Sequence, residues 1–203
     1  MFMQVIQGHV RDAEALRRAA EQWRNELQAG ARGFLGSTSG VTQDGTGVVV
    51  ARFETEEAAR ANSQRPEQSA WWERTAPIFD EGVSFIDCPD CDVVMGGGSD
   101  DAHFVQLIEC RATDREAMRQ VGRALEESLP TQRPEILGGV LGWRDDHEFV
   151  QVMYFTDEEH ARTGERAMQD NPQAQQWVRV LDGEPKFLDL REPTFAPARR
   201  GGG

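Results

Sequence analysis

Three cysteines are the first residues whose type and spacing could support chemistry. Cys88 and Cys91 form a C-x-x-C pair, which could serve thiol redox chemistry or supply half of a zinc site, and Cys110 stands alone. A structural zinc site usually needs four ligands, and no second C-x-x-C or H-x-x-x-H pair follows. The segment after Cys91 leads into three glycines, whereas a thioredoxin-like motif would open a helix. We therefore predict no metal site and interpret the cysteines as incidental thiols.

Histidines are the usual acid–base groups near neutral pH, and the chain has four of them. His9 follows an expected strand, His103 lies at the edge of a glycine-rich segment, His147 falls in a turn, and His160 falls in the first turns of a helix. We expect each of them to be a solvated side chain. The sequence also lacks a G-x-S-x-G motif, a phosphate-binding loop and a G-x-G-x-x-G motif.

Aromatic side chains near isolated polar groups are the better candidates for a small-molecule site. Such a site needs an apolar cavity and one or two hydrogen-bond donors that stabilise a substrate anion. The candidates in the first half of the chain are Gln4, Arg52, Asn62, Trp71 and Trp72. The candidates in the second half are Gln106, Trp143, Tyr154, His160 and Trp177. The alternative is that the tryptophans simply fill the core, because a tryptophan on an amphipathic helix buries a large apolar area.

Composition limits the partners that such a site could serve. The chain has 203 residues and a formal net charge of -13, and a field of that sign repels nucleic-acid phosphates and anionic membrane surfaces. No apolar run approaches the roughly 20 residues needed to span a bilayer, and the N-terminus lacks the pattern of a signal peptide. We expect a soluble cytoplasmic protein with no nucleic-acid or membrane partner.

An internal repeat organises the whole chain. Shifting the sequence by 102 residues aligns 2–60 with 104–162 without a gap, and 19 of the 59 aligned pairs are identical. The matched pairs include Gln4 with Gln106 and, further on, Asp87 with Asp189. Arg52 aligns with Tyr154, and Ala58 aligns with His160. The sequence therefore predicts two copies of one structural unit.

Each copy has the same expected order of elements: strand, helix, strand, strand, helix, strand. In the first copy we expect strands at 3–10, 34–42, 47–53 and 83–87, with helices at 12–27 and 55–62 and a further helical segment after Pro66. The second copy repeats them at 104–112, 114–129, 136–144, 148–155, 156–170 and 186–190. This order is the ferredoxin-like split βαβ arrangement. We predict an α+β chain in which two tandem ferredoxin-like (βαββαβ) units form a pseudo-dimeric α/β barrel.

A glycine-rich segment sets the expected boundary between the two units. The first unit would cover 1–95 and the second 103–195, joined by a glycine-rich polar linker at 96–102. The remaining residues, 196–203, are expected to be a disordered tail.

The sequence resembles the dimeric α/β-barrel superfamily, and within it the antibiotic-biosynthesis-monooxygenase-like (ABM) group. In this chain two such units would be fused in tandem. The resemblance covers about 2–190. It depends on the duplicated order of elements, on the strand around Gln4, and on the helical segment 65–72, in which Pro66 precedes Trp71 and Trp72. The resemblance implies small-molecule chemistry, because the superfamily includes cofactor-independent monooxygenases, haem-degrading enzymes, polyketide cyclases and isomerases.

Haem degradation is the most specific of the implied activities. The resemblance would then require an Asn on the first strand and a Trp and a His on the second helix. Gln4 occupies the strand position and no histidine lies near Trp71. His160 precedes Trp177 by 17 residues, about 25 Å along a continuous helix. We therefore expect no haem and no other cofactor.

Two classes of function remain open. One is a small-molecule enzyme of the ABM-like type, such as a cofactor-independent monooxygenase or a cyclase acting on an aromatic or polyketide-like substrate. The other is a non-catalytic protein of the same fold that binds a ligand or serves assembly. In both cases the expected partner is a small apolar or aromatic molecule, and the chain is expected to be a self-contained pseudo-dimer that could associate further. The first unit, with Trp71 and Trp72, is the favoured location of the site.

Overall fold

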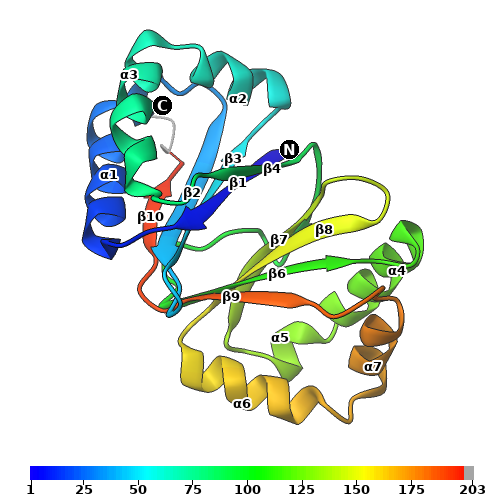
Figure 1. Ribbon diagram of the computed structural model, residues 1–203. Coiled ribbons are helices and arrows are strands. Elements are labelled where there is room, and N and C mark those ends of the chain that lie inside the picture. The colour runs from blue at the N-terminus through cyan, green and yellow to red at the C-terminus, as the bar shows by residue number, and fades with distance from the viewer. Residues whose placement is uncertain (199–203) are drawn as a thin grey trace, which may run out of the picture. The chain divides into compact units, whose positions relative to one another are not determined.

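The computed structural model describes residues 1–198 and divides the chain into two compact units (Figure 1). The first unit comprises Met1–Asp90 together with the C-terminal segment that begins at Leu190, and the second comprises Cys91–Asp189. No helix in the described part of the chain is long and apolar enough to cross a membrane.

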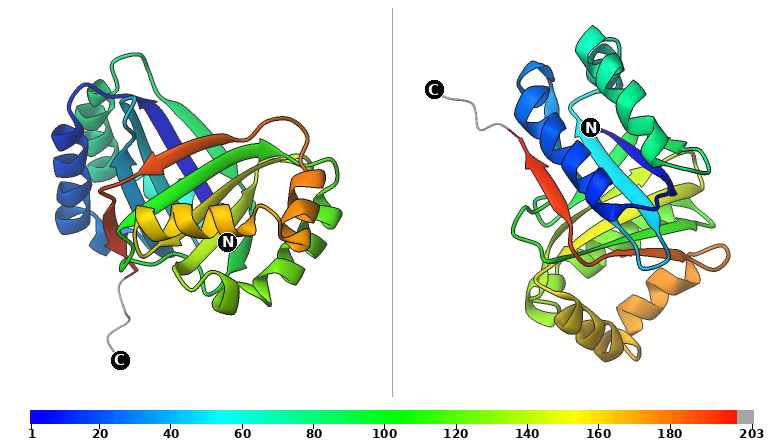
Figure 2. Two further views of the ribbon diagram at one scale, coloured as in Figure 1. Left: turned by 90° about the horizontal axis from the view of Figure 1, so that it is seen from below. Right: turned by 60° about the vertical axis from the view of Figure 1, so that its left-hand side comes forward.

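The first unit contains the expected order of elements. Its strands and helices are β1 (Phe2–His9), α1 (Ala13–Glu26), β2 (Phe34–Val41), β3 (Thr46–Phe53), α2 (Glu56–Ser63), α3 (Pro66–Thr75), β4 (Ser84–Cys88) and β10 (Thr194–Pro197), with short 3-10 turns at Gln28–Gly30 and Ala76–Ile78. The five strands form one sheet in the order β10-β2-β3-β1-β4. Helices α1 and α3 lie on the same side of this sheet in both views of Figure 2.

The second unit repeats this plan. Its elements are β5 (Asp90–Val94), β6 (Phe104–Arg111), α4 (Arg115–Glu126), α5 (Leu129–Gln132), β7 (Ile136–Trp143), β8 (Glu148–Phe155), α6 (Glu158–Met168), α7 (Pro172–Arg179) and β9 (Lys186–Leu190). Its sheet has the order β5-β7-β8-β6-β9, which matches the first sheet strand for strand. The prediction of two ferredoxin-like α+β units is confirmed.

Side-chain caps explain where the helices of both copies begin. Asp12 accepts a hydrogen bond from the Ala15 amide at 3.2 Å, and the equivalent Asp114 accepts from the Ala117 amide at 2.6 Å. Such caps satisfy amides that have no partner inside the helix. Thr55 caps α2 in the same way. The repeated cap residues are therefore a direct cause of the repeated helices.

The fifth strand of each sheet differs from the expected organisation. Residues 90–94 continue beyond β4 as β5 and pair with β7, so this segment belongs to the second sheet rather than to the end of the first unit. Residues 95–103 then contain no helix or strand.

The C-terminal segment behaves similarly, because residues 194–197 form β10 beside β2. Ala196 is buried, and Gln28 Nε2 donates to the Pro197 carbonyl at 2.5 Å. The expected disordered tail is thus a strand in its first residues, and its remainder, 199–203, lies outside the described residues.

Candidate functional site

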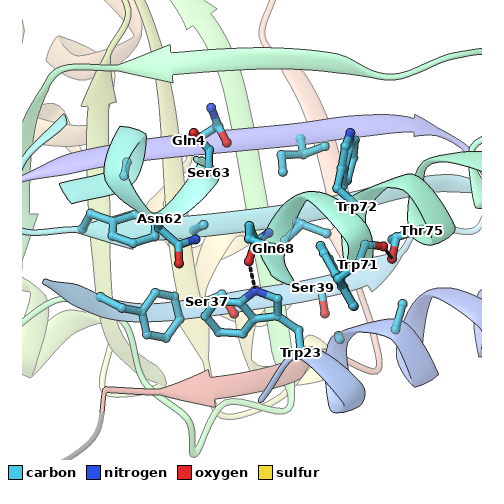
Figure 3. A pocket seen from close by; sticks show the side chains of 18 of the residues that line it. Gln4, Trp23, Ser37, Ser39, Asn62, Ser63, Gln68, Trp71, Trp72 and Thr75 are labelled. Atoms are coloured by element: carbon cyan, nitrogen blue, oxygen red, sulfur yellow. Dashed lines mark hydrogen bonds between the residues drawn. The ribbon is translucent and has the colours of Figure 1, made fainter. Parts of the chain in front are cut away.

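A cavity of about 290 Å³ lies between the sheet and the helices of the first unit (Figure 3). This volume is close to the lower end of the range typical of small-molecule pockets, about 300–1,000 Å³. Residues from β1–β4 and α1–α3 surround it. The lining comprises Phe2, Gln4, Ile6, Leu16, Ala19, Ala20, Trp23, Phe34, Ser37, Ser39, Val49, Ala51, Phe53, Glu56, Ala59, Arg60, Asn62, Ser63, Gln68, Trp71, Trp72, Thr75, Phe79 and Asp87.

Strand alternation selects which strand residues reach this cavity. Phe2, Gln4 and Ile6 on β1 line it, whereas Met3 and Val5 between them are fully buried and do not line it. The same alternation on β3 brings Val49, Ala51 and Phe53 to the cavity and keeps Arg52 out of the lining.

Gln4 and Asp87 form the first polar pair of the site. They are directly opposite each other on β1 and β4, and Gln4 Nε2 donates to Asp87 Oδ1 at 2.7 Å. The other carboxylate oxygen of Asp87 has no hydrogen-bond or ionic partner among the described residues. Because β4 is the last strand of its sheet and Asp87 is exposed, this carboxylate lies at the mouth of the cavity.

Trp23 and Gln68 form the second polar pair. The indole Nε1 of Trp23 donates to Gln68 Oε1 at 2.7 Å, joining α1 to α3 (Figure 3). Trp23 also packs on Phe34, with ring centroids 4.8 Å apart. The pair therefore fixes one aromatic wall of the cavity.

Trp71 differs from Trp23, because its indole nitrogen has no acceptor. Its Nε1 is buried and makes no hydrogen bond within the described part of the chain. Trp71 lies on α3 among the labelled side chains that surround the cavity in Figure 3, and its ring is 6.1 Å from that of Trp72. A buried polar group without a partner costs about 1–3 kcal/mol, so the fold retains an unfavourable donor at this wall.

Asn62 has a role in holding two helices together. Its Oδ1 accepts from Arg65 Nη1 at 2.8 Å, and the same Arg65 nitrogen donates to the Leu27 carbonyl at 3.1 Å. Asn62 is buried and lines the cavity. The junction between α2 and α3 therefore fixes its side chain.

The second unit has its own cavity, of about 390 Å³, between its sheet and helices. Two expected candidates, Gln106 and Trp177, line it. Gln106 Nε2 donates to Asp189 Oδ1 at 3.0 Å, which reproduces the pair formed by Gln4 and Asp87. The complete lining is Val94, Gln106, Ile108, Met118, Gly122, Leu125, Leu129, Arg133, Ile136, Leu141, Gln151, Met153, Phe155, Glu165, Met168, Gln169, Ala174, Gln175, Trp177, Val178 and Phe187.

Three other candidates of the second half lie away from this cavity. Trp143 is buried, packs on Phe149 and donates from Nε1 to Asp92 Oδ2 at 2.8 Å. Tyr154 is buried on the opposite face of β8 from the lining residues. His160 lies in the first turn of α6, where its backbone amide donates to the capping residue Asp157 at 2.9 Å, and its side chain is 69% exposed.

The two units differ in one ion pair at equivalent positions. In the second unit Arg162 Nη2 bonds Asp189 Oδ2, and its guanidinium carbon lies 5.2 Å from the centre of the Phe104 ring. In the first unit the equivalent Arg60 bonds Glu56 at 2.7 Å. The first cavity includes Phe2, Arg60 and Asp87, whereas the second stops short of their counterparts.

No cluster of three or more His, Cys, Asp or Glu side chains that could hold a metal ion occurs in residues 1–198. Cys88, Cys91 and Cys110 form no disulfide among the described residues, and Cys88 is buried on β4. The chemical groups that the first cavity offers are therefore an aromatic wall, an indole donor without an acceptor, and a carboxylate at the mouth.

Sequence reasoning missed Asp87, Trp23 and Gln68 as residues of the site. The match of Asp87 with Asp189 in the repeat was the available signal, since the glutamines that bond them also match. Trp23 and Gln68 have no equivalent pair in the repeat, because the position of Trp23 is Leu125 in the second copy.

Comparison with known proteins places the chain by its fold. No protein-family model and no curated protein sequence matches it. Among solved structures, a protein from Fusobacterium nucleatum named "putative monooxygenase" superposes with a TM-score of 0.76 and 14% identity over 99% of this chain and 95% of its own. An anthrone oxidase-like protein superposes with a TM-score of 0.61 and 14% identity, covering 96% of this chain and 93% of its own.

A third structure connects the fold to a named group. A ferredoxin-fold protein from Listeria monocytogenes, described as related to antibiotic biosynthesis monooxygenases, superposes with a TM-score of 0.51 and 10% identity over 96% of this chain and 95% of its own. The fold is therefore a pair of ferredoxin-like α+β units. More particularly, this fold is shared with proteins that are described as monooxygenases or as related to them.

Proposed function

We propose that the cavity of the first unit binds a planar aromatic molecule with an acidic C–H or O–H group, and that the protein oxidises it with molecular oxygen without a cofactor. The observation that carries this proposal is the buried Nε1–H of Trp71, which lacks an acceptor at the wall of an aromatic cavity. An oxyanion formed on a bound substrate would supply that acceptor, and such stabilisation of developing charge is a large term in catalysis.

The proposed roles follow from the positions of the groups. Trp23 and Phe34 offer ring faces for a flat substrate, since aromatic pairs gain from stacked or edge-to-face contact. Asp87 would accept the substrate proton at the mouth, with Gln4 holding one of its oxygens. Trp71 would hydrogen-bond the resulting oxyanion.

The reaction balances with oxygen as the only co-reactant. For a methylene between two aromatic rings, as in anthrone, one methylene group and one molecule of oxygen give one ketone and one molecule of water. The carbanion formed by proton loss gives electrons to oxygen, a C–O bond forms, and the O–O bond of the peroxide then breaks. One oxygen atom stays on carbon, and the other leaves as water with both methylene hydrogens.

The chemical names of structures with the same fold support this class of substrate. One of them is an anthrone oxidase-like protein and another is named as a monooxygenase. Because the sequence identities are 14%, we use these names only to choose anthrone as the first probe.

Oxygen uptake with anthrone as the probe tests the proposal. We expect turnover by the unmodified protein, a decrease of about 10²-fold or more in kcat for Asp87→Asn, and about 10²-fold for Trp71→Phe. His160→Ala is the matched control, because its repeat equivalent is Ala58 and it lies outside both cavities; it should keep full activity. Saturable binding of anthrone without oxygen uptake would instead support the non-catalytic ligand-binding alternative.

A further inference from the structure

The cavity of the second unit differs from that of the first in size, lining and hydrogen-bonding character. It is larger, about 390 Å³ against about 290 Å³, although the two units share one fold. Two changes between equivalent positions account for much of the difference in character. Val178 stands where the first unit has Trp72, and Gln151 stands where it has Val49.

The first change affects the mouth of the cavity. In the first unit Trp72 packs edge-to-face on Phe85, with ring centroids 5.5 Å apart. Val178 has no ring to offer the equivalent Phe187, and both residues line the second cavity while remaining 60% and 53% exposed. The mouth is therefore apolar and open, which suits a ligand whose apolar end reaches the edge of the site.

The second change places a polar group inside. Gln151 lines the cavity from β8, opposite Ile108 on β6. Its Nε2 lies 3.2 Å from Met153 Sδ, and its Oε1 is buried without a hydrogen-bond partner among the described residues. Because a thioether sulfur can only accept, this orientation of the amide is the favoured one. The cavity therefore presents an unsatisfied acceptor, whereas the first cavity presents an unsatisfied donor.

The charged residues of the lining are already neutralised. Arg133 Nε donates to Glu135 Oε1 at 2.5 Å, and Glu165 accepts from Arg162 Nη1 at 3.1 Å. A charged ligand would have to compete with these pairs, so a neutral ligand is favoured.

The apolar lining is unusually adaptable. Met118, Met153 and Met168 line this cavity, and the lining of the first cavity contains no methionine. Methionine is flexible and polarisable, and it adjusts to ligands of irregular or variable shape. Leu125 and Ile136 stand where the first cavity has Trp23 and Phe34, so the aromatic part of this lining is limited to Phe155, Trp177 and Phe187.

We propose that the cavity of the second unit is a separate binding site for a neutral, flexible, largely aliphatic molecule that carries a hydroxyl group. The hydroxyl donates to Gln151 Oε1, the chain packs among the three methionines, and its far end lies at Val178 and Phe187. This site does not depend on the reaction proposed for the first unit.

Methyl NMR of the full chain with 13C-methyl methionine tests the proposal, with 1-octanol as the probe. Heptyl methyl ether, an isomer that can accept but not donate a hydrogen bond, is the matched ligand. We expect 1-octanol to shift the methyl signals of Met118, Met153 and Met168 saturably and to leave that of Met3 in the first unit unchanged. We expect the alcohol to bind about tenfold more tightly than the ether.

Gln151→Val removes the acceptor, and the chain itself provides evidence that valine fits, because Val49 faces Ile6 at the same place in the first unit. In this variant the preference for the alcohol should fall to about one, while the ether binds as before. The proposal is overturned if the three methyl signals do not respond, if the ether binds as tightly as the alcohol to the unmodified protein, or if octanoate binds more tightly than 1-octanol.

Discussion

Gln4 donates a hydrogen bond to Asp87 across β1 and β4, and this pair is reproduced 102 residues later by Gln106 and Asp189. The copies differ in what else bonds the carboxylate. Arg162 bonds Asp189 in the second unit, whereas the equivalent Arg60 in the first unit bonds Glu56 instead. The first copy therefore keeps a carboxylate oxygen available at the mouth of a cavity, and the second copy uses its carboxylate as a structural bridge.

This difference predicts unequal effects of removing the two carboxylate charges. Asp189→Asn should lower the free energy of unfolding by about 1–2 kcal/mol, because Asp189 and Arg162 are both largely shielded from solvent. Asp87→Asn should change the free energy of unfolding by less than about 0.5 kcal/mol, because Asp87 is exposed and has no ionic partner to lose. Urea denaturation of both variants measures the difference. Equal losses would mean that the two carboxylates have the same structural role.

The repeat made most of the fold predictable, because the same caps, turns and alternating strands occur twice in one register. The strands β5 and β10 could not be predicted in this way. Each has four or five residues, lies next to proline or glycine, and is stabilised by pairing with a strand far away in the sequence. No local pattern carries that information.

Part of the lining of the first cavity could also be predicted from the sequence. Four of the expected candidates line the first cavity: Gln4, Asn62, Trp71 and Trp72. The fifth, Arg52, lies on β3 between two lining residues and does not reach the cavity. Asp87 looked like one more surface acid in a chain with a charge of -13. Its importance depends on the register of β1 with β4, which only the structure provides.

The two tryptophans of the first cavity should respond differently to replacement by phenylalanine. Trp23→Phe removes the hydrogen bond to Gln68 and leaves a partly buried amide oxygen without a donor, whereas Trp71→Phe removes a donor that has no acceptor. Because both variants lose a similar volume, the difference isolates the hydrogen bond. Trp23→Phe should be less stable than Trp71→Phe by about 1 kcal/mol, measured by chemical denaturation. A larger loss for Trp71→Phe would show that its indole nitrogen has a partner in solution.

His9 provides a prediction about pH. Its hydrogen bond with Asp80, at 2.8 Å, raises the pKa of the imidazole above the ordinary value of 6.5. A raised pKa in the folded state means that protonation of His9 stabilises the fold below about pH 6.5, and that this contribution disappears as the pH rises through the folded-state pKa.

Titration of the imidazole by NMR measures this shift directly. We expect the pKa of His9 to fall toward the ordinary value in Asp80→Asn. The pKa of His160, which Asp157 raises independently, should stay elevated in that variant. An unchanged His9 titration in Asp80→Asn would contradict the structural pairing.

Introducing the tryptophan of the first unit at the mouth of the second cavity should weaken ligand binding there. Val178→Trp in the second unit restores the ring that Trp72 places against Phe85 in the first, so the new indole should pack on Phe187. Val178 is 60% exposed, and the substitution should therefore cost little stability, within about 0.5 kcal/mol. Because the added ring narrows an open apolar mouth, 1-octanol should bind at least about tenfold more weakly. A narrower mouth also slows exit, so the dissociation rate constant should rise by a smaller factor than the affinity falls. Val178→Ala is the matched control, since it leaves the mouth open and should keep the affinity within about threefold. Unaltered binding in Val178→Trp would mean that the ligand enters and lies elsewhere in the unit.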